Sequence, residues 1–298
     1  MLRTRFFSIC IFLLGILLTD SINAADNFRN ALRYYNEGKF FVASIEFERA
    51  IFYETDIPKI AQYKYYKSLC YKNEGDITKA INELDGINLY KLPDTLMFLI
   101  RYEGALCNYL NGDPNKAIWL IDEIRLDNPD SSENLNILPL NVLCLNSIRK
   151  WEDAHDLLNF LIVNSDLTEF EKKKLTVEVD EIYNDKRLPK FKKPAKAENL
   201  SRFIPGSGQM YSGAVGEGSF NFLMNASILG FAAYEFYTRY YFTGYFVGLG
   251  LLNKTYNGGI RRAGILADKR NQKTMDVFNF RISSILIGIS GDNNILRN

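Results

Sequence analysis

The sequence predicts an all-α protein in which a helical-hairpin solenoid is followed by a C-terminal apolar helical hairpin. Three observations lead to this fold class: an internal period of 37 residues, helical spacing of apolar residues within each period, and two long apolar stretches in the last third. The chain has 298 residues, with 36 Lys and Arg against 35 Asp and Glu, and 47% apolar residues. This composition argues against a disordered chain and gives no reason to expect nucleic acid as a partner.

The N-terminus, residues 1–24, is typical of a secretory signal peptide. Arg3 and Arg5 form a short basic start, an apolar run extends from Phe6 to Leu18, and Ala24 stands at a suitable cleavage spacing. The alternative is an uncleaved membrane anchor, although the run is shorter than the roughly 20 residues that a span prefers. In both cases we expect the following segment to be exported.

The 37-residue period is the strongest signal in the chain. It relates three cysteines, three glycines and four alanines: Cys70, Cys107 and Cys144; Gly38, Gly75 and Gly112; Ala43, Ala80, Ala117 and Ala154. Repeats of this length indicate stacked helical hairpins, each relying on its neighbours to bury its apolar face. Equivalent sites on stacked helices lie about 8–10 Å apart, too far for a disulfide, so we expect the three cysteines to be buried and reduced.

The second period illustrates the expected hairpin. Residues 65–73 form one helix, residues 74–76 a turn and residues 78–87 the next helix, with the apolar side chains of the second helix on one face. A small residue early in the second helix allows the partner helix to approach closely, and a glycine at the turn allows a backbone conformation that other residues resist.

These positions resemble the tetratricopeptide repeat pattern of small, Tyr, Gly, Ala, aromatic and Ala residues. The matches are Ala31, Tyr34, Gly38, Ala43, Phe47 and Ala50 in the first unit; Ser68, Tyr71, Gly75, Ala80, Leu84 and Ile87 in the second; and Ala105, Asn108, Gly112, Ala117, Ile121, Ile124 and Pro129 in the third. The fourth unit keeps Ala154, Leu158 and Leu161 but departs from the pattern at Val142, Leu145 and Arg149. The period is also longer than the family's usual 34 residues. We expect a polar capping helix at residues 168–185 to close the array.

The resemblance implies a concave groove lined by the first helix of each hairpin, a surface that binds peptide in many repeat proteins. We expect nine residues there: Phe28, Leu32, Tyr35, Tyr65, Leu69, Lys72, Tyr102, Leu106 and Tyr109. With Lys72 as the main charge, the set does not match the basic clamp with which some family members hold a terminal carboxylate. The alternative is that these aromatic residues only pack between neighbouring repeats.

A basic segment at residues 186–198 follows the repeats. It holds six positive charges and no acidic residue between Lys186 and Lys196, and it is interrupted by Pro189 and Pro194. We interpret it as an extended linker, attracted to anionic lipid through residues such as Lys190, Lys192 and Lys193, or else serving only as a solvated tether.

A glycine-rich motif, Pro-Gly-x-Gly-Gln-x-Tyr-x-Gly, precedes the apolar stretches at residues 218–237 and 240–252. The motif resembles the C-terminal membrane segment of uncharacterised bacterial envelope proteins that follow tetratricopeptide repeats. The glycines of the motif favour a sharp turn before the first apolar helix, and we expect Gln209 and Tyr211 to form hydrogen bonds at a headgroup boundary. The membrane-site residues of the motif are Pro205, Gly206, Gly208, Gln209, Tyr211 and Gly213.

The charges leave three arrangements open for the two apolar stretches. The basic linker and the later cluster at residues 261–270 would lie on the exported side of a double crossing, with only Arg239 in the loop, against the positive-inside tendency. The hairpin therefore crosses a membrane, lies on or partly enters it, or forms the core of a soluble helical domain. Residues 277–289 alternate like a short strand.

The functional prediction follows from these segments: residues 1–24 a signal peptide, 25–185 the repeat domain, 186–198 the linker, and 199–298 a membrane-associated hairpin and tail. We expect an exported, membrane-tethered adaptor on the periplasmic face of a bacterial membrane, binding a protein or peptide through its groove. The alternative is a membrane-embedded accessory subunit of an envelope transport or secretion assembly. With the single His155 and no paired carboxylates, phosphate loop or ligand cluster, we expect no enzyme, cofactor or metal site.

Overall fold

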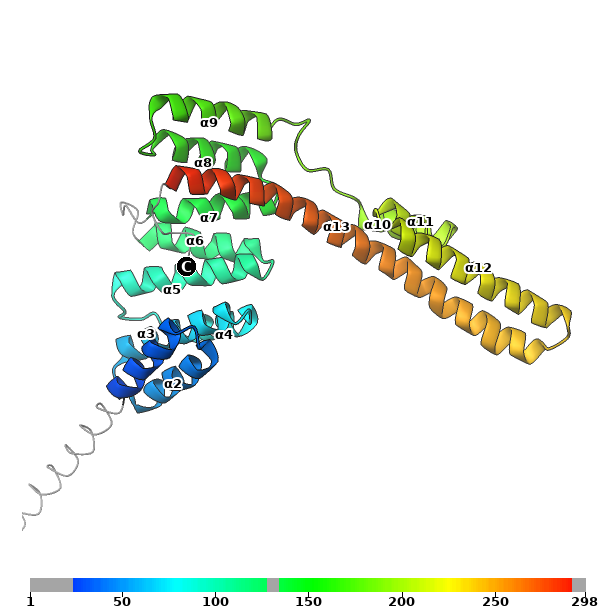
Figure 1. Cartoon of the computed structure of the whole chain (residues 1–298), viewed down its shortest axis with the longest axis horizontal. Helices are drawn as coiled ribbons and strands as arrows, with labels where there is room; N and C mark the ends of the chain where they lie inside the picture. Colours follow the sequence, from blue (N-terminus) through cyan, green and yellow to red (C-terminus); the bar gives the residue numbers. More distant parts are fainter. Residues whose placement is uncertain (1–23, 128–133, 291–298) are drawn as a thin grey trace, which may run out of the picture. The chain divides into compact units, whose positions relative to one another are not determined.

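The computed structural model describes residues 24–127 and 134–290, and every regular element in these ranges is a helix (Figure 1). The all-α prediction is therefore confirmed. The signal peptide predicted from residue 1, Pro129 and the end of the C-terminal tail lie outside the described residues, apart from Ala24.

The chain divides into two compact units between Lys172 and Lys173, and each is described by itself. The division falls within α9 (Glu169–Ile182), the helix predicted as a cap, rather than at the start of the basic segment. Unit 1 contains a helical segment at 24–36 followed by α2 to α8. The bounds are α2 (Phe40–Tyr53), α3 (Ile57–Asn73), α4 (Ile77–Asp85), α5 (Asp94–Leu110), α6 (Pro114–Asp127), α7 (Asn134–Ser147) and α8 (Trp151–Val163).

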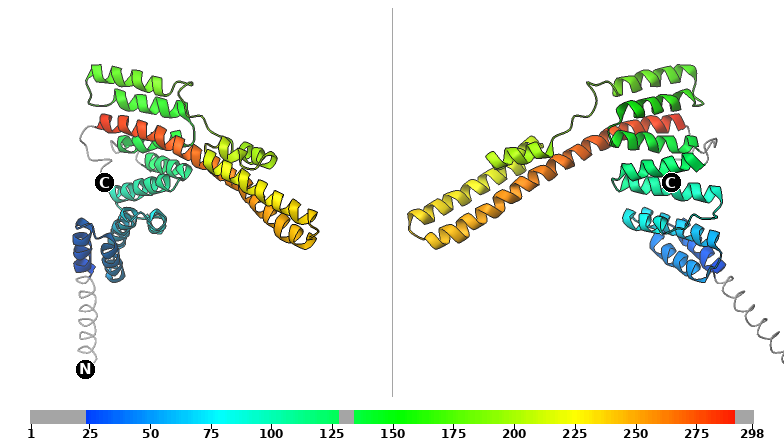
Figure 2. Two further views of the ribbon diagram at one scale, coloured as in Figure 1. Left: turned by 45° about the vertical axis from the view of Figure 1, so that its right-hand side comes forward. Right: turned by 180° about the vertical axis from the view of Figure 1, so that it is seen from behind.

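Helices of unit 1 pack in chain order (Figures 1 and 2). From α2 to α8, each helix contacts the next, and contacts also join α3 to α5 and α5 to α7. The second predicted hairpin is confirmed at its turn, since α3 ends at Asn73 and α4 begins at Ile77, but α3 already starts at Ile57 and α4 ends at Asp85, before the predicted residue 87. The first helices of successive hairpins, α3, α5 and α7, therefore contact one another in turn, and α4 and α6 each contact the helices before and after them in the chain.

The turn inside each hairpin has the same backbone in all four periods. Gly38, Gly75 and Gly112 adopt φ of 73°, 81° and 83°, and Arg149 occupies the fourth equivalent position with φ 65°. In every case the next residue donates its N–H to a carbonyl five residues earlier: Lys39 to Tyr34, Asp76 to Tyr71, Asp113 to Asn108 and Lys150 to Leu145, each at 2.9 Å. This is the bonding that closes a helix through a left-handed residue. The fourth unit therefore keeps the turn although its sequence lacks the glycine.

The interior of unit 1 follows the same period. Ala43, Ala80, Ala117 and Ala154 are fully buried, and so are Ala31, Ser68, Ala105 and Val142. Three thiols are buried and free, as predicted, at Cys70, Cys107 and Cys144. Burial raises the pKa of each of these thiols to about 12, with Glu74 and Glu103 adding to the effect at Cys70 and Cys107. The cysteines therefore serve as small apolar side chains in the core.

Unit 2 contains the end of α9 and five further elements. They are α10 (Pro194–Phe203), α11 (Ser207–Tyr211), α12 (Val215–Tyr237), the π-helix η1 (Thr243–Leu249) and α13 (Gly250–Ser290). The chain reverses after α12, and η1 and the start of α13 pack back along it, so the predicted helical hairpin is present. The basic segment is non-helical up to Lys193, but its last part begins α10 at Pro194 rather than continuing an extended linker.

The predicted strand at residues 277–289 is wrong, because this stretch is the end of α13. Its buried apolar side chains are Phe278, Ile282, Ile285 and Leu286, which follow the helical spacing of three and four residues. The short alternating pattern coexists with this spacing, and packing decides between them. At the same end, the ring of Tyr183 packs edge-to-face on Phe278, with centroids 5.6 Å apart.

Across the described residues, none of the helices combines the length and the hydropathy expected of a membrane span.

Candidate functional site

The nine predicted groove residues occupy the segment 24–36, α3 and α5, and all nine are half-buried. We call this set the aromatic wall. None of its members is fully buried in the core and none is largely exposed, so each side chain is partly used for packing and partly accessible. Both interpretations of the set, packing and groove, therefore have to be resolved position by position.

The N-terminal end of the aromatic wall is used for packing. The ring of Phe28 stacks on Tyr63 with centroids 4.4 Å apart, and it also contacts Phe47 and Tyr66 at 5.9 Å. Tyr63 is in turn buried and donates its hydroxyl to Glu54 at 3.3 Å. Aromatic clusters of this kind join neighbouring helices through large contact areas. Phe28 therefore holds the first two hairpins together.

The middle of the aromatic wall combines tyrosine rings with polar partners. The Nδ2 of Asn73 on α3 donates to the hydroxyl of Tyr35 at 3.3 Å. Burial raises the pKa of Tyr35 and, more strongly, that of Tyr65, so both phenols stay neutral. The ring of Tyr65 lies edge-to-face on Tyr66 at 5.6 Å. Neutral phenols can offer both a ring face and a hydroxyl to a peptide.

The charge expected at Lys72 is internally neutralised. Its Nζ lies 2.8 Å from Oε1 of Glu103 on α5, and the two side chains are only 13% and 6% exposed. The Sγ of Cys107, one turn later on α5, contacts the same carboxylate oxygen at 3.6 Å. Glu103 also contributes, after burial, to the raised pKa of Tyr102. The aromatic wall is therefore centred on a buried ion pair rather than on a free positive charge.

Glu103 is the site residue that sequence reasoning missed. It stands 37 residues after Tyr66, so a carboxylate occupies a repeat position that an aromatic ring fills in the preceding hairpin. A charged residue at an inward-facing repeat position needs an opposite charge nearby, which was the available signal. A second such pairing joins α2, α3 and α4 of the first two hairpins, where Lys67 on α3 lies 2.7 Å from both Glu48 and Glu83.

The C-terminal part of the aromatic wall lies on α5. The rings of Phe98 and Tyr102 are stacked with centroids 6.1 Å apart, and burial raises the pKa of Tyr102. Leu106 and Tyr109 continue along the same helix and are half-buried. The structure thus brings Tyr35, Tyr65, Tyr102 and the ion pair into one neighbourhood, linked by the electrostatic influence of Glu103 on the three phenols.

The predicted membrane residues belong to unit 2, and the glycines of the motif pack helices together. A Cβ added to Gly206 would lie 2.0 Å from the carbonyl oxygen of Gly218, and one added to Gly208 would lie 1.9 Å from that of Ala197. No side chain fits such spaces. Gly213 has φ 91° and forms the expected turn before α12. Gly206 and Gly208 are therefore internal contact points of α10, α11 and α12.

Gln209 corrects the expectation of a headgroup contact. Its side chain is 1% exposed; its Oε1 accepts from Ser201 Oγ at 3.0 Å, and its Nε2 donates to the carbonyl of Gly259 at 3.1 Å. A buried amide is stable only with such partners. Gln209 therefore links α10, α11 and α13 inside unit 2. Pro205, by contrast, is half-buried and lines a cavity.

Tyr211 contacts the basic segment, which is itself part of unit 2. Its hydroxyl accepts from the N–H of Lys193 at 3.3 Å, and the Nζ of Lys192 lies 4.6 Å from the ring centroid. The backbone of Lys192 exchanges two hydrogen bonds with the Asn271 side chain, at 2.7 and 2.8 Å. Lys190 and Lys193 are exposed. Positive charge is therefore held on the surface of unit 2 near α10, not on a free tether.

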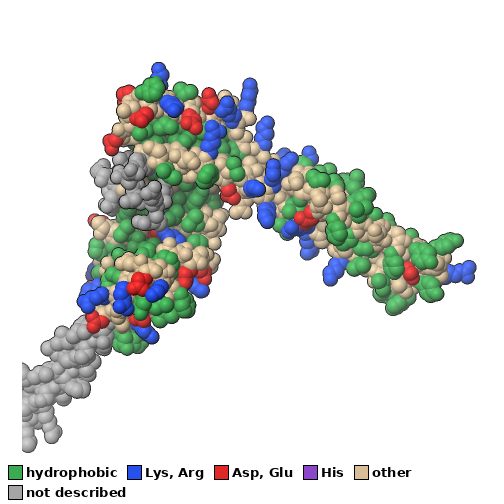
Figure 3. Space-filling model, in the orientation of Figure 1, with side chains coloured by type: hydrophobic (Ala, Val, Ile, Leu, Met, Phe, Trp, Pro, Cys, Tyr) green, Lys and Arg blue, Asp and Glu red, His purple; other side chains and the backbone are tan. Residues whose placement is uncertain are grey.

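The hairpin of unit 2 carries many exposed hydrophobic side chains (Figure 3). Those exposed by more than half include Phe220, Leu223, Leu229, Tyr234, Tyr237, Tyr240, Tyr241, Phe242, Tyr245, Phe246 and Val247. Their density is far above that of isolated surface hydrophobics, which need no explanation. A patch of this kind is typical of a surface that binds a membrane or another protein.

In the described part of the chain, no group of three or more His, Cys, Asp or Glu side chains is placed to hold a metal ion. Comparisons with known proteins add nothing to this geometry, since no protein-family model, curated protein or solved structure matches the chain.

Proposed function

We propose that this chain is an exported, membrane-associated adaptor that binds another polypeptide through the aromatic wall. The observation that carries the proposal is the repetition of one backbone turn at Gly38, Gly75, Gly112 and Arg149. Four hairpins with a common period are typical of a tetratricopeptide-like solenoid, whose first helices form one continuous surface. The half-buried state of all nine wall residues fits such a surface.

The chemistry of the aromatic wall favours an apolar or aromatic peptide segment. The phenols of Tyr35, Tyr65 and Tyr102 are neutral at physiological pH, as a phenol is at its ordinary pKa near 10, and burial raises the pKa of each further. The Lys72 ammonium is already paired with Glu103, so a terminal carboxylate would have to compete with an internal partner. Peptides that present apolar side chains from a helix or an extended chain suit a surface of this kind.

Membrane association is supported by unit 2. The hairpin exposes a dense set of hydrophobic side chains, and the basic residues Lys190, Lys193 and Arg202 are exposed on or just before α10 of the same unit. Apolar side chains beside positive charge suit attachment to an anionic lipid surface, with roughly 1 kcal/mol contributed per basic residue close to the membrane. Export is supported by the signal-like residues 1–24.

Site-specific photocrosslinking on the full-length protein tests the proposal. A photoreactive residue replaces Leu69 or Tyr109 on the aromatic wall, with Leu126, which is 80% exposed on α6, as the control position. We expect both wall positions to capture the same polypeptide from a cell-envelope extract and Leu126 to capture none. If wall and control positions give the same products, the aromatic wall is not a binding surface.

A second candidate function is an accessory subunit of an envelope transport or secretion assembly, and the exposed hairpin favours it. A photoreactive residue at Phe220, which is 68% exposed on α12, distinguishes the two. Capture of a membrane polypeptide at Phe220 without capture at Leu69 or Tyr109 would favour the accessory subunit.

A further inference from the structure

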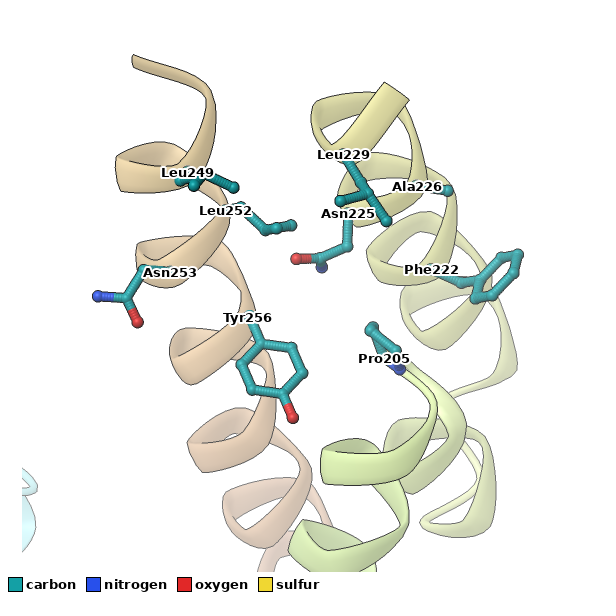
Figure 4. Close-up of a pocket in the computed structure, with 9 residues that line it drawn as sticks. All are labelled: Pro205, Phe222, Asn225, Ala226, Leu229, Leu249, Leu252, Asn253 and Tyr256. Atoms are coloured by element: carbon teal, nitrogen blue, oxygen red, sulfur yellow. The ribbon is translucent and has the colours of Figure 1, made fainter. Parts of the chain in front are cut away.

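Unit 2 contains an apolar cavity of about 580 Å³ between α12 and the chain that packs back along it (Figure 4). Pro205 lies at one end of the cavity, and the side chains of Leu229 and Leu252 point into it from opposite helices. It is also lined by Phe222, Asn225, Ala226, Leu249, Asn253 and Tyr256. The volume lies in the range typical of sites for small ligands.

Close helix contacts on either side of the cavity explain how it is held in place. A Cβ added to Gly248 would lie 2.6 Å from the Cβ of Ala232, and one added to Gly259 would lie 2.7 Å from the Asn221 amide. These small residues let the two helices touch above and below the cavity. Between these two contacts, the larger side chains that line the cavity keep the helices apart, so the position of the cavity is fixed by the packing of the hairpin.

The polar groups around the cavity already have partners inside the protein. Asn225 donates its Nδ2 to the carbonyl of Asn221 at 2.8 Å and accepts from Thr255 Oγ1 at 3.0 Å. The hydroxyl of Tyr256 donates to the carbonyl of Arg202 at 2.6 Å. Figure 4 shows Asn253 turned away from the space. A ligand would therefore meet apolar surface and the ring of Tyr256.

The shape of the cavity suits a linear ligand. Its lining runs from Phe222 to Leu229 on α12 and from Leu249 to Tyr256 on the opposite side. At 1.5 Å per residue, each wall is roughly 10 Å long. The neighbouring surface is also apolar, since Phe203 and Ile204, next to Pro205, are 87% and 55% exposed. A chain of methylene groups can lie along such a cleft and continue over its rim.

We propose that this cavity binds one acyl chain, from a fatty acid or from a membrane lipid. An acyl chain needs no hydrogen-bond partner, whereas the N–H and C=O groups of a polypeptide would lose water there without gaining one. The site is separate from the aromatic wall of unit 1, so it can be present even if the wall binds no peptide.

A fluorescent polyene fatty acid, cis-parinaric acid, tests the proposal with the full-length protein. The variant Leu252→Trp fills the cavity, and Leu251→Trp, next to it on α13 and 48% exposed, is the matched control outside the lining. We expect saturable binding to the unmodified protein, at least tenfold weaker binding to Leu252→Trp, and less than a twofold change in Leu251→Trp. Circular dichroism checks that both variants fold.

If Leu252→Trp does not fold, Leu229→Trp on the opposite wall takes its place, with Leu223→Trp as the control; their side chains are 54% and 62% exposed. Absence of saturable binding, or equal binding by cavity and control variants, would overturn the proposal.

To identify the source of the bound acyl chain, the same polyene is supplied to the protein in two forms. One arm uses the free fatty acid in buffer, and the other uses phosphatidylcholine vesicles carrying a parinaroyl phospholipid. Uptake that Leu252→Trp abolishes in the first arm indicates a free acid, and in the second arm a bilayer lipid; both outcomes support the acyl site. Failure of both arms overturns it.

Discussion

Removing Lys72 and removing Glu103, the two partners of one buried ion pair, should destabilise unit 1 by different amounts. The Glu103 carboxylate is 6% exposed and the Lys72 side chain 13%, so both lie close to the buried limit. Loss of one member of a buried pair costs about 3–5 kcal/mol, because the remaining charge is left without a partner. We expect Lys72→Met to reach this range, since it strands the more buried carboxylate. Glu103→Leu should cost less, because the lysine can extend its ammonium towards water.

The double variant provides the sharper result. In Lys72→Met/Glu103→Leu no charge is stranded, so we expect its stability to return to within about 1 kcal/mol of the original protein or to exceed it. A matched surface control is Arg125→Met, whose ion pair with Asp122 spans 4.0 Å and has both side chains more than half exposed. That change should cost less than about 1 kcal/mol.

Thermal unfolding followed by tryptophan fluorescence measures these effects. Both tryptophans, Trp119 and Trp151, lie in unit 1, so the signal reports on that unit. A loss of about 3 kcal/mol should lower its midpoint by roughly 6–12 °C, at about 2–4 °C per kcal/mol for a domain of this size. If Lys72→Met costs no more than Arg125→Met, the pair is open to water and the reasoning is refuted.

Three further predictions concern the turn, the thiols and the glycine motif. Arg149→Gly should be more stable than Arg149→Ala by about 1 kcal/mol, because only glycine adopts the observed φ of 65° without strain; equal midpoints in urea unfolding would contradict this. Iodoacetamide should modify Cys107 at least about 1,000-fold more slowly at pH 8 in the native than in the unfolded protein, since burial raises the thiol pKa from 9.0 to about 12. Mass spectrometry with and without guanidinium measures the two modification rates, and equal rates would show that the thiol is accessible. Gly208→Ala should disrupt unit 2, because the added Cβ would meet the Ala197 carbonyl. Gly230→Ala, whose added Cβ has no atom within 4 Å, should instead stabilise α12 by about 0.5–1 kcal/mol. Hydrogen exchange of unit 2 that is the same in both variants would refute the close packing at Gly208.

The sequence was sufficient to predict the hairpins of unit 1, since the 37-residue period appears in residues whose roles depend on local geometry. Ala80 and Gly75 are examples: one is buried at a helix crossing and the other adopts a left-handed turn, and each role can be read from residue type and spacing. The same approach did not predict that the fourth unit keeps the turn of the other three. Arg149 adopts the turn conformation without being glycine, because the flanking helices hold the backbone there.

The helices that carry the nine wall positions were predicted, whereas the contacts of two of these positions were not. The nine positions of the aromatic wall were placed on the correct helices, but Phe28 is used in packing and Lys72 is paired with Glu103. That pairing joins residues on two different hairpins, and spacing along one helix carries no information about it. The strand prediction at residues 277–289 was wrong for a related reason: a short alternating pattern does not show which face a neighbour will cover.

By itself, the sequence determined the all-α class, the 37-residue period, the buried free cysteines and the position of the apolar hairpin. Each depends on residue type and local spacing, and these act over one or two turns of helix. The tertiary structure alone decided that Gln209 is internal, that Lys72 is neutralised by Glu103 and that a cavity lies between α12 and α13. These features depend on which helices meet, and contacts between residues 30 to 50 positions apart are set by packing rather than by local pattern.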